Sequence, residues 1–434
     1  MGKLNLLTEQ GRFSDFYRNK YGYNAKNINI IVTHGCNLRC TYCYEHHKDN
    51  NLSMTKETAR KIVDLLFEED SKNSRYLNEE NAHGLVFDFI GGEPLLEIDL
   101  ISYFMDYFRE KAFKLNHRWL NNYMINMTSN GINYFDKKVQ DFLEMNYGRV
   151  SISITVDGNE ELHNTCRLFP NGKGSYSYAA AALKDIVKKY NQRGTKLTFA
   201  KENIQYLYDA IVNMIEEFDL NYIFGNCAFE PEWNKDDARI FYYQLKKLAD
   251  YLIDTDRYSN VYVHLLNADI GKASSEQSDT NWCGGTGNML AFDINGEIYP
   301  CLRYAPLSIG DKQPKLLLGN LEDGLLNSKE TIEVADVLDS ITRTSQSEEK
   351  CLSCPIGGGC AWCSAYNYEV FGTPNKRVTN ICIMHQARVL AKYYYINKLC
   401  NKLNCPEEKM KIRIPEDWAL DIISKEEFEM IKNL

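Results

Sequence analysis

From about residue 28 to residue 255, short runs of β-branched and aromatic residues alternate with longer amphipathic stretches. The runs that predict strands are 27–33, 85–90, 123–129, 151–156, 195–200 and 221–226. A first helix is predicted after a candidate N-cap at Ser53. Further helices are predicted at 95–113, 136–146, 176–190, 203–217 and 236–254. About six β/α units of this kind favour a parallel α/β sheet, either open or curved into a partial barrel.

Length and charge narrow the choice of protein class. A chain of 434 residues exceeds what one hydrophobic core usually serves, so we expect two domains, or a large one and a smaller one. The formal net charge of −9 argues against a nucleic-acid-binding surface. No apolar run approaches the ~18 residues that span a bilayer, and the N-terminus lacks the apolar core of a signal peptide. We therefore expect a cytoplasmic protein that binds neither nucleic acid nor a membrane.

Fourteen cysteines are unevenly spread along the chain. In a reducing cytoplasm, metal or cluster ligation explains so many thiols better than a disulfide framework does. They gather near residue 40 and again after residue 282, which suggests a metal-bearing body followed by a metal-rich appendage. The predicted parts are an N-terminal extension at 1–27, a β/α body at 28–255, a linker at 256–282, a cysteine-rich domain at 283–400 and a C-terminal tail at 401–434.

The first group of cysteines has the spacing C-x₃-C-x₂-C, directly after the first predicted strand. Three thiolates on one loop can hold three irons of a [4Fe–4S] cluster; a zinc site is the alternative, but no fourth ligand is nearby. Cys36, Cys40 and Cys43, with the aromatic Tyr42 before the last of them, resemble the signature of the radical SAM superfamily. The resemblance implies that S-adenosylmethionine (SAM) binds the open iron and is cleaved reductively to a 5′-deoxyadenosyl radical.

Three later loops add to the resemblance, because GGEP (91–94), TSNG (128–131) and TVDG (155–158) follow successive predicted strands. Sites in parallel α/β architectures assemble at these carboxyl ends. The SAM-binding residues that the resemblance implies are Gly91, Gly92, Glu93 and Pro94 at the methionyl amino end, and Ser129, Asn130 or Thr155 at the ribose. Arg167 is predicted to pair with the SAM carboxylate, the alternative being a surface arginine. Asp157 is a candidate catalytic residue that orients the substrate or takes a proton, the alternative being a turn cap.

The second group of cysteines runs C-x₁₇-C, then C-x₂-C-x₅-C-x₂-C, then one more cysteine. Alone it could be a pair of zinc ribbons; together with the first group it resembles a SPASM domain, although the last x₂ spacing is x₃ more often in that family. The resemblance implies two auxiliary [4Fe–4S] clusters, making three clusters in all. Their implied ligands are Cys283, Cys301 and Cys363 for the first, and Cys351, Cys354, Cys360 and Cys382 for the second. One iron of the first is left open, unless Cys227 or Cys166 completes it. The fold expected is thus a partial (β/α)₆ TIM-like barrel with a C-terminal iron–sulfur SPASM domain.

SPASM-bearing enzymes mostly modify ribosomally made peptides, so the resemblance implies a peptide maturase. Formation of a thioether between a cysteine sulfur and a carbon is the leading expectation, and carbon–carbon or carbon–oxygen crosslinking is the alternative. Formylglycine formation, the reaction of anaerobic sulfatase maturases, is a less favoured alternative. Those enzymes have an acidic residue where Leu302 stands here, so the expected base is missing. A non-catalytic iron–sulfur electron carrier is a remote alternative, since it would not explain the three later loops. Residues 1–27 are too few for a leader-peptide-binding module, so leader binding would need the C-terminal tail, the linker or a separate protein. We also expect an electron donor such as flavodoxin or ferredoxin.

Overall fold

The computed structural model describes residues 25–46, 50–68, 73–78, 82–281 and 283–434, so most of the predicted N-terminal extension lies outside the described residues. Seven parallel strands form the body in two adjoining sheets. The first sheet pairs β1 (Ala25–Thr33), β2 (Gly84–Gly91), β3 (Tyr123–Ser129) and β4 (Val150–Ile154) in chain order, and the second pairs β5 (Gly194–Phe199), β6 (Tyr222–Cys227) and β7 (Tyr262–Val263). The six strands predicted from the sequence are confirmed to within two residues at each end.

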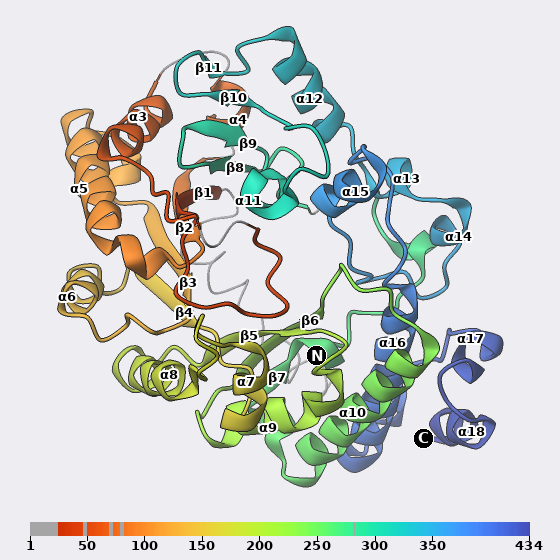
Figure 1. Ribbon diagram of the computed structural model, residues 1–434. Helices are drawn as coiled ribbons and strands as arrows, with labels where there is room; N and C mark the ends of the chain where they lie inside the picture. Colours follow the sequence, from red (N-terminus) through yellow and green to blue (C-terminus); the bar gives the residue numbers. More distant parts are fainter. Residues whose placement is uncertain (1–24, 47–49, 69–72, 79–81, 282) are drawn as a thin grey trace.

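Helices cover the outer face of this curved sheet, as a partial barrel requires (Figure 1). They are α3 (Lys56–Leu66), α4 (Ser74–Leu77), α5 (Ile98–Lys114), α6 (Lys137–Met145), α7 (Glu160–Cys166), α8 (Tyr176–Tyr190), α9 (Leu207–Glu216) and α10 (Lys235–Asp254). The predicted N-cap at Ser53 is wrong. The Thr55 side chain instead accepts a hydrogen bond from the Thr58 amide and begins α3, while the Ser53 hydroxyl donates to Glu97 at 2.5 Å.

Alternation along β2 shows which face of the sheet is packed. Phe87 and Phe89 are fully buried and make edge-to-face contacts with Phe104 of α5, with ring centroids 5.4 Å apart in both pairs. Asp88, between them, therefore points to the opposite, inner side of the barrel. Polar side chains of β2 such as Asp88 therefore face the interior of the barrel, opposite the helices.

The chain after residue 282 extends the first sheet rather than standing apart from it. Strand β8 (Met289–Phe292) pairs in parallel with β1, and β9 (Glu297–Tyr299), β10 (Gly319–Asn320) and β11 (Gly324–Leu325) follow antiparallel. Short helices complete this region: α11 (Pro306–Ile309), α12 (Lys329–Asp339), α13 (Arg343–Gln346), α14 (Glu349–Leu352) and α15 (Ser364–Phe371).

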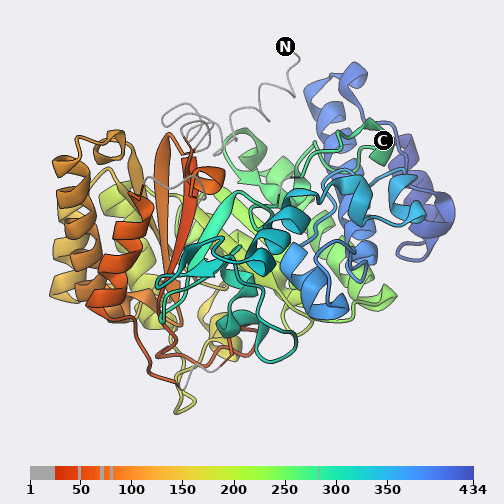
Figure 2. The same ribbon diagram turned by 90° about the horizontal axis from the view of Figure 1, so that it is seen from above.

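The long helix α16 (Cys382–Leu403) packs against α10, and α17 (Glu416–Leu420) and α18 (Lys425–Asn433) lie beside it at the end of the molecule away from α5 (Figure 2). Tyr242 of α10 donates to Glu427 of α18 at 2.5 Å, which fixes the C-terminal tail to the body. No helix in the described part of the chain is long and apolar enough to cross a membrane.

Candidate functional site

The loop directly after β1 lies against α7 and the segment that follows it. It carries the first predicted cluster ligands, Cys36, Cys40 and Cys43. The Arg39 amide donates to the Leu168 carbonyl at 2.7 Å, and the Thr41 amide donates to the Cys166 carbonyl at 3.0 Å. All three cysteines are half-buried, so the loop that carries them is neither fully enclosed nor fully exposed.

The GGEP loop, residues 91–94, packs directly under this cysteine loop. The Gly92 amide donates to the Thr33 carbonyl at 3.0 Å, and the Glu93 amide to the Gly35 carbonyl at 2.9 Å. A Cβ atom on Gly92 would lie 2.2 Å from the Gly35 carbonyl oxygen, closer than any real contact allows. The glycine is therefore required for the approach of the two backbones, in addition to the predicted approach of SAM, which stays a prediction.

The Glu93 carboxylate joins the second and third loops. It is buried and accepts hydrogen bonds from the Ser129 hydroxyl at 2.7 Å, the Asn130 amide at 2.8 Å and the Leu95 amide at 3.1 Å. Burial raises the pKa of Glu93, while these three donors act in the opposite direction. Because three protein donors already occupy the carboxylate, its clearest role is to fix the GGEP loop to the end of β3.

The TSNG loop reaches back to the cysteine loop. The Asn130 side-chain amide donates to the side-chain oxygen of Asn37, Oδ1, at 2.6 Å and lies 3.9 Å from the Cys36 sulfur. Thr155 is half-buried and its amide donates to the Ser129 carbonyl at 3.0 Å. The predicted residues of successive loops are thus brought together at one edge, and their contacts with a ribose stay predictions.

A buried network joins the fourth loop to the cysteine loop. The Tyr42 hydroxyl donates to Asp157 and accepts from the Arg167 guanidinium at 2.8 Å. Arg167 is 8 % exposed, so the alternative of a surface arginine is wrong. The Asp157 amide donates to the His163 ring at 3.3 Å, and burial lowers the pKa of His163 to about 3, so this histidine is neutral and structural.

Two atoms of this network are left without partners among the described groups. They are the second carboxylate oxygen of Asp157 and the Nε of Arg167, both buried. Burial raises the pKa of Asp157, and the nearby charge of Arg167 acts against that shift. A buried acceptor and a buried donor without partners are costly unless a ligand satisfies them. An amino acid, with its ammonium and carboxylate groups, has the matching pair of functions.

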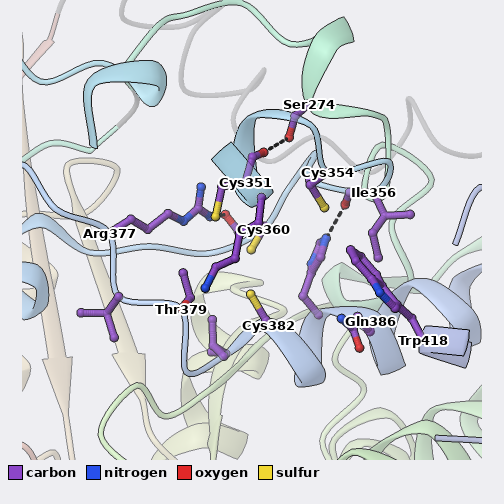
Figure 3. Close-up of a pocket in the computed structure, with 15 residues that line it drawn as sticks. Ser274, Cys351, Cys354, Ile356, Cys360, Arg377, Thr379, Cys382, Gln386 and Trp418 are labelled. Carbon is purple, nitrogen blue, oxygen red and sulfur yellow. Dashed lines mark hydrogen bonds between the residues drawn. The ribbon is translucent and has the colours of Figure 1, made fainter. Parts of the chain in front are cut away.

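The four cysteines predicted to hold the second auxiliary cluster line one cavity of about 330 Å³. The four sulfurs point into it from α14, the loop after it and the start of α16 (Figure 3). They belong to Cys351, Cys354, Cys360 and Cys382. No three His, Cys, Asp or Glu side chains of the described chain are arranged to hold a single metal ion. The cavity suits a larger group with four thiolate ligands, as a [4Fe–4S] cluster is.

Arg377 and His385, which the sequence analysis missed, are among the residues that border this cavity. Arg377 donates to the Cys360 carbonyl at 3.0 Å, and the His385 ring lies 2.7 Å from the Ile356 carbonyl. His385 stands three residues after Cys382 at the start of α16, and this helical spacing was the available signal.

The three cysteines predicted to hold the first auxiliary cluster, Cys283, Cys301 and Cys363, also lie near one another. The thiols of Cys283 and Cys363 both act on the pKa of Cys301, and the Ser364 hydroxyl lies 3.2 Å from the Cys283 sulfur. Cys227 stands elsewhere, in a small cavity beside Arg388. Cys166 adjoins the first cysteine loop instead. A fourth protein ligand from either of them therefore stays a prediction.

Arg303, also missed from the sequence, connects the triad with the first cysteine loop. Its guanidinium lies 4.6 Å from the centre of the Tyr44 ring and donates to Glu230 at 2.8 Å. The thiol of Cys363 is among the groups that act on its pKa. The two cysteine sites therefore face a shared region of the molecule.

Comparisons with known proteins agree with this geometry. Residues 30–211 match the family model of the Radical SAM superfamily. The chain is 26 % identical over 351 residues to a cysteine-type anaerobic sulfatase-maturating enzyme of Clostridium perfringens, covering 76 % of this chain and 86 % of that protein. It is 23 % identical over 361 residues to the radical SAM cyclopropyl synthase TigE of Paramaledivibacter caminithermalis, covering 78 % and 68 %.

Solved structures show the same fold. Native anSMEcpe with bound AdoMet and the Cp18Cys peptide superposes with a TM-score of 0.61 at 19 % identity, over 87 % of this chain and 99 % of that one. Streptococcus suis SuiB bound to its precursor peptide SuiA gives a TM-score of 0.52 at 16 % identity, over 85 % and 78 %. The family match shows that residues 30–211 form a radical SAM domain, so the chain is a radical SAM enzyme.

Proposed function

We propose that this enzyme cleaves SAM at Cys36, Cys40 and Cys43 and uses the radical to modify a peptide. The observation that carries the proposal is the open pair of atoms on Asp157 and Arg167 beside the first cysteine loop. A cluster held by the three thiolates would supply the electron that cleaves SAM and so generates the 5′-deoxyadenosyl radical. The protein's part is to fix the methionyl end of SAM, Arg167 taking its carboxylate and Asp157 a hydrogen-bond donor.

Replacing Asp157 with Asn should weaken SAM binding tenfold or more. A hydrogen bond to a charged group contributes about 1.5–3 kcal/mol, and the substitution also removes the charge that opposes buried Arg167. Equilibrium dialysis of the anaerobically reconstituted enzyme with labelled SAM gives the dissociation constant directly.

A matched control exists outside the site. Asp185 accepts a hydrogen bond from the Tyr134 hydroxyl at 2.7 Å and pairs with Lys189 at 3.2 Å, so Asp185→Asn disturbs a similar trio of groups. It should leave SAM affinity unchanged. Equal SAM affinity in Asp157→Asn and Asp185→Asn would mean that the Asp157 network has only a structural role.

The peptide reaction that we propose is thioether formation. A Cys sulfur joins a carbon of the same peptide as two hydrogens are lost: one as an atom to the 5′-deoxyadenosyl radical, giving 5′-deoxyadenosine, the other from the thiol as a proton. One electron is left over, for which the auxiliary sites are the acceptors within the chain. Cys283, Cys301 and Cys363 offer a cluster three thiolates, which would leave one position for the peptide thiolate.

Formylglycine formation is the second candidate, since the curated relatives reported above include sulfatase-maturating enzymes. Leu302 still stands where those enzymes have an acid, but Asp88 could take the proton instead. Burial raises the pKa of Asp88 to about 7, and no described group forms a hydrogen bond or an ion pair with it. It acts on the pKa of Tyr44, which places it near the first cysteine loop.

Mass spectrometry of short Cys-containing peptides encoded beside the gene separates the candidates. We expect a product two hydrogens lighter in which one cysteine no longer alkylates, because its sulfur is bonded to carbon. Cys301→Ala should still form 5′-deoxyadenosine but no such product, whereas Cys227→Ala should form both. A dehydrogenated peptide whose cysteines all alkylate would contradict the thioether, and an aldehyde captured by a hydrazide would establish formylglycine formation.

A further inference from the structure

The first auxiliary triad is enclosed by two buried hydroxyl groups that no motif pointed to. Ser364 begins α15 directly after Cys363 and is fully buried, and its oxygen lies 3.2 Å from the Cys283 sulfur. Tyr304 follows Cys301 by three residues and ends a short helical turn, residues 302–304. Both hydroxyls are therefore placed by the same chain segments that place the cysteines.

Tyr304 is the more informative of the two. It is 1 % exposed, and its hydroxyl makes no hydrogen bond of ordinary geometry with a described group, although the Ser364 hydroxyl is close enough to act on the Tyr304 pKa as a hydrogen-bonding group. The thiols of Cys301, Cys283 and Cys363 all act on it electrostatically, Cys301 most strongly. A buried hydroxyl without a partner is rare and costly. It is explained if the space beside the three sulfurs is filled by a group that accepts a hydrogen bond.

The backbone and a neighbouring ring fix the positions of the triad and of the Tyr304 side chain. A Cβ on Gly285 would lie 3.0 Å from the Cys301 sulfur and 3.4 Å from the Ser364 oxygen, so the backbone closes one side of the triad. The Tyr304 ring packs beside that of Tyr368, with centroids 6.0 Å apart. Ring packing therefore holds the phenol beside the Ser364 hydroxyl, without a hydrogen bond of ordinary geometry to a described group.

We propose that Tyr304 donates a hydrogen bond to the sulfur of the first auxiliary cluster and thereby raises its reduction potential. The inference rests on the proposed cluster at Cys283, Cys301 and Cys363 and assigns Tyr304 a positioning and tuning role, not a ligand role. Hydrogen bonds to cluster sulfurs stabilise the reduced form, which carries one more negative charge. A raised potential makes this site a better acceptor for the electron that peptide oxidation leaves.

The test uses full-length protein in which Cys36, Cys40 and Cys43 are replaced by Ala, so that only the auxiliary clusters contribute. Redox titration followed by EPR then compares Tyr304→Phe with Tyr368→Phe. The control is matched because the Tyr368 hydroxyl already donates to the Pro314 carbonyl at 2.9 Å. We expect one midpoint potential to become more negative in Tyr304→Phe, and both to be unchanged in Tyr368→Phe.

A second measurement reads the hydrogen bond itself. Proton ENDOR spectra in H₂O and D₂O should show an exchangeable proton coupled to the cluster, lost in Tyr304→Phe. If Tyr304→Phe keeps its full iron content and both its midpoint potentials and its ENDOR spectra are unchanged, the inference about Tyr304 is wrong, while the proposed function still stands. The inference is also wrong if a phenolate-to-iron absorption band disappears in Tyr304→Phe, or if that variant loses iron, because either makes Tyr304 a ligand. If Cys301→Ala removes no iron, the proposed cluster itself is wrong, and the inference falls with it.

Discussion

Replacing Cys36, Cys40 and Cys43 with Ala should abolish 5′-deoxyadenosine formation, a loss of at least a thousandfold under anaerobic reduction with SAM. The three thiolates are the predicted ligands of the cluster that delivers the electron, and no other described cysteine lies on their loop. Iron should fall by about four per chain, the content of one [4Fe–4S] cluster. The auxiliary iron should remain, since its predicted ligands all lie in the chain after residue 282, away from the first cysteine loop.

The matched control replaces Cys227, Cys400 and Cys405, which are buried and lie outside the predicted ligand sets. That variant should retain its iron and its SAM cleavage. Persistent 5′-deoxyadenosine formation in the first variant would overturn the assignment of the cluster loop. Loss of all iron in both variants would mean that the cysteines act through folding and not through ligation.

Much of the barrel could be predicted because its strands carry a local signal. The run predicted at 85–90 is β2, Gly84–Gly91, in which Phe87 and Phe89 pack outward while Asp88 faces inward. The pairing of β8 with β1 could not be predicted, because the partners Asn27 and Met289 are 262 positions apart and β8 has only four residues. Periodicity within a short window contains no information on such a partner.

The site shows the same division between local and long-range information. Spacing and order led to the GGEP loop and to the cysteines, because those residues follow one another in the chain. The network of Tyr42 with Asp157 and Arg167 joins positions 125 residues apart, so Arg167 could only be suggested, with a surface position as the alternative. Tyr304 carried no signal except its position in the turn after Cys301, since a lone tyrosine is usually a core residue.

Substitution of Gly92 by Ala should remove the SAM-cleaving cluster almost as completely as loss of its ligands. The added Cβ would lie 2.2 Å from the Gly35 carbonyl oxygen and 2.5 Å from the Gly35 carbonyl carbon. Gly35 precedes Cys36, and backbone atoms cannot rotate away as a flexible side chain can. The cysteine loop must therefore move by several tenths of an ångström or more, and a displacement of about 1 Å at a reacting centre can cost a hundredfold in rate.

Gly194→Ala is the matched control, because a Cβ there meets the Tyr222 side chain at an ordinary 3.6 Å on β5. We expect this control to retain the iron content, circular dichroism and 5′-deoxyadenosine formation of the unmodified enzyme. Gly92→Ala should keep the circular dichroism, since the clash is confined to two loops, but lose about four irons per chain and at least 99 % of the 5′-deoxyadenosine. A Gly92→Ala enzyme with normal iron and normal cleavage would mean that the cysteine loop tolerates displacement. The close packing of GGEP under Gly35 would then be incidental to the position of the cluster.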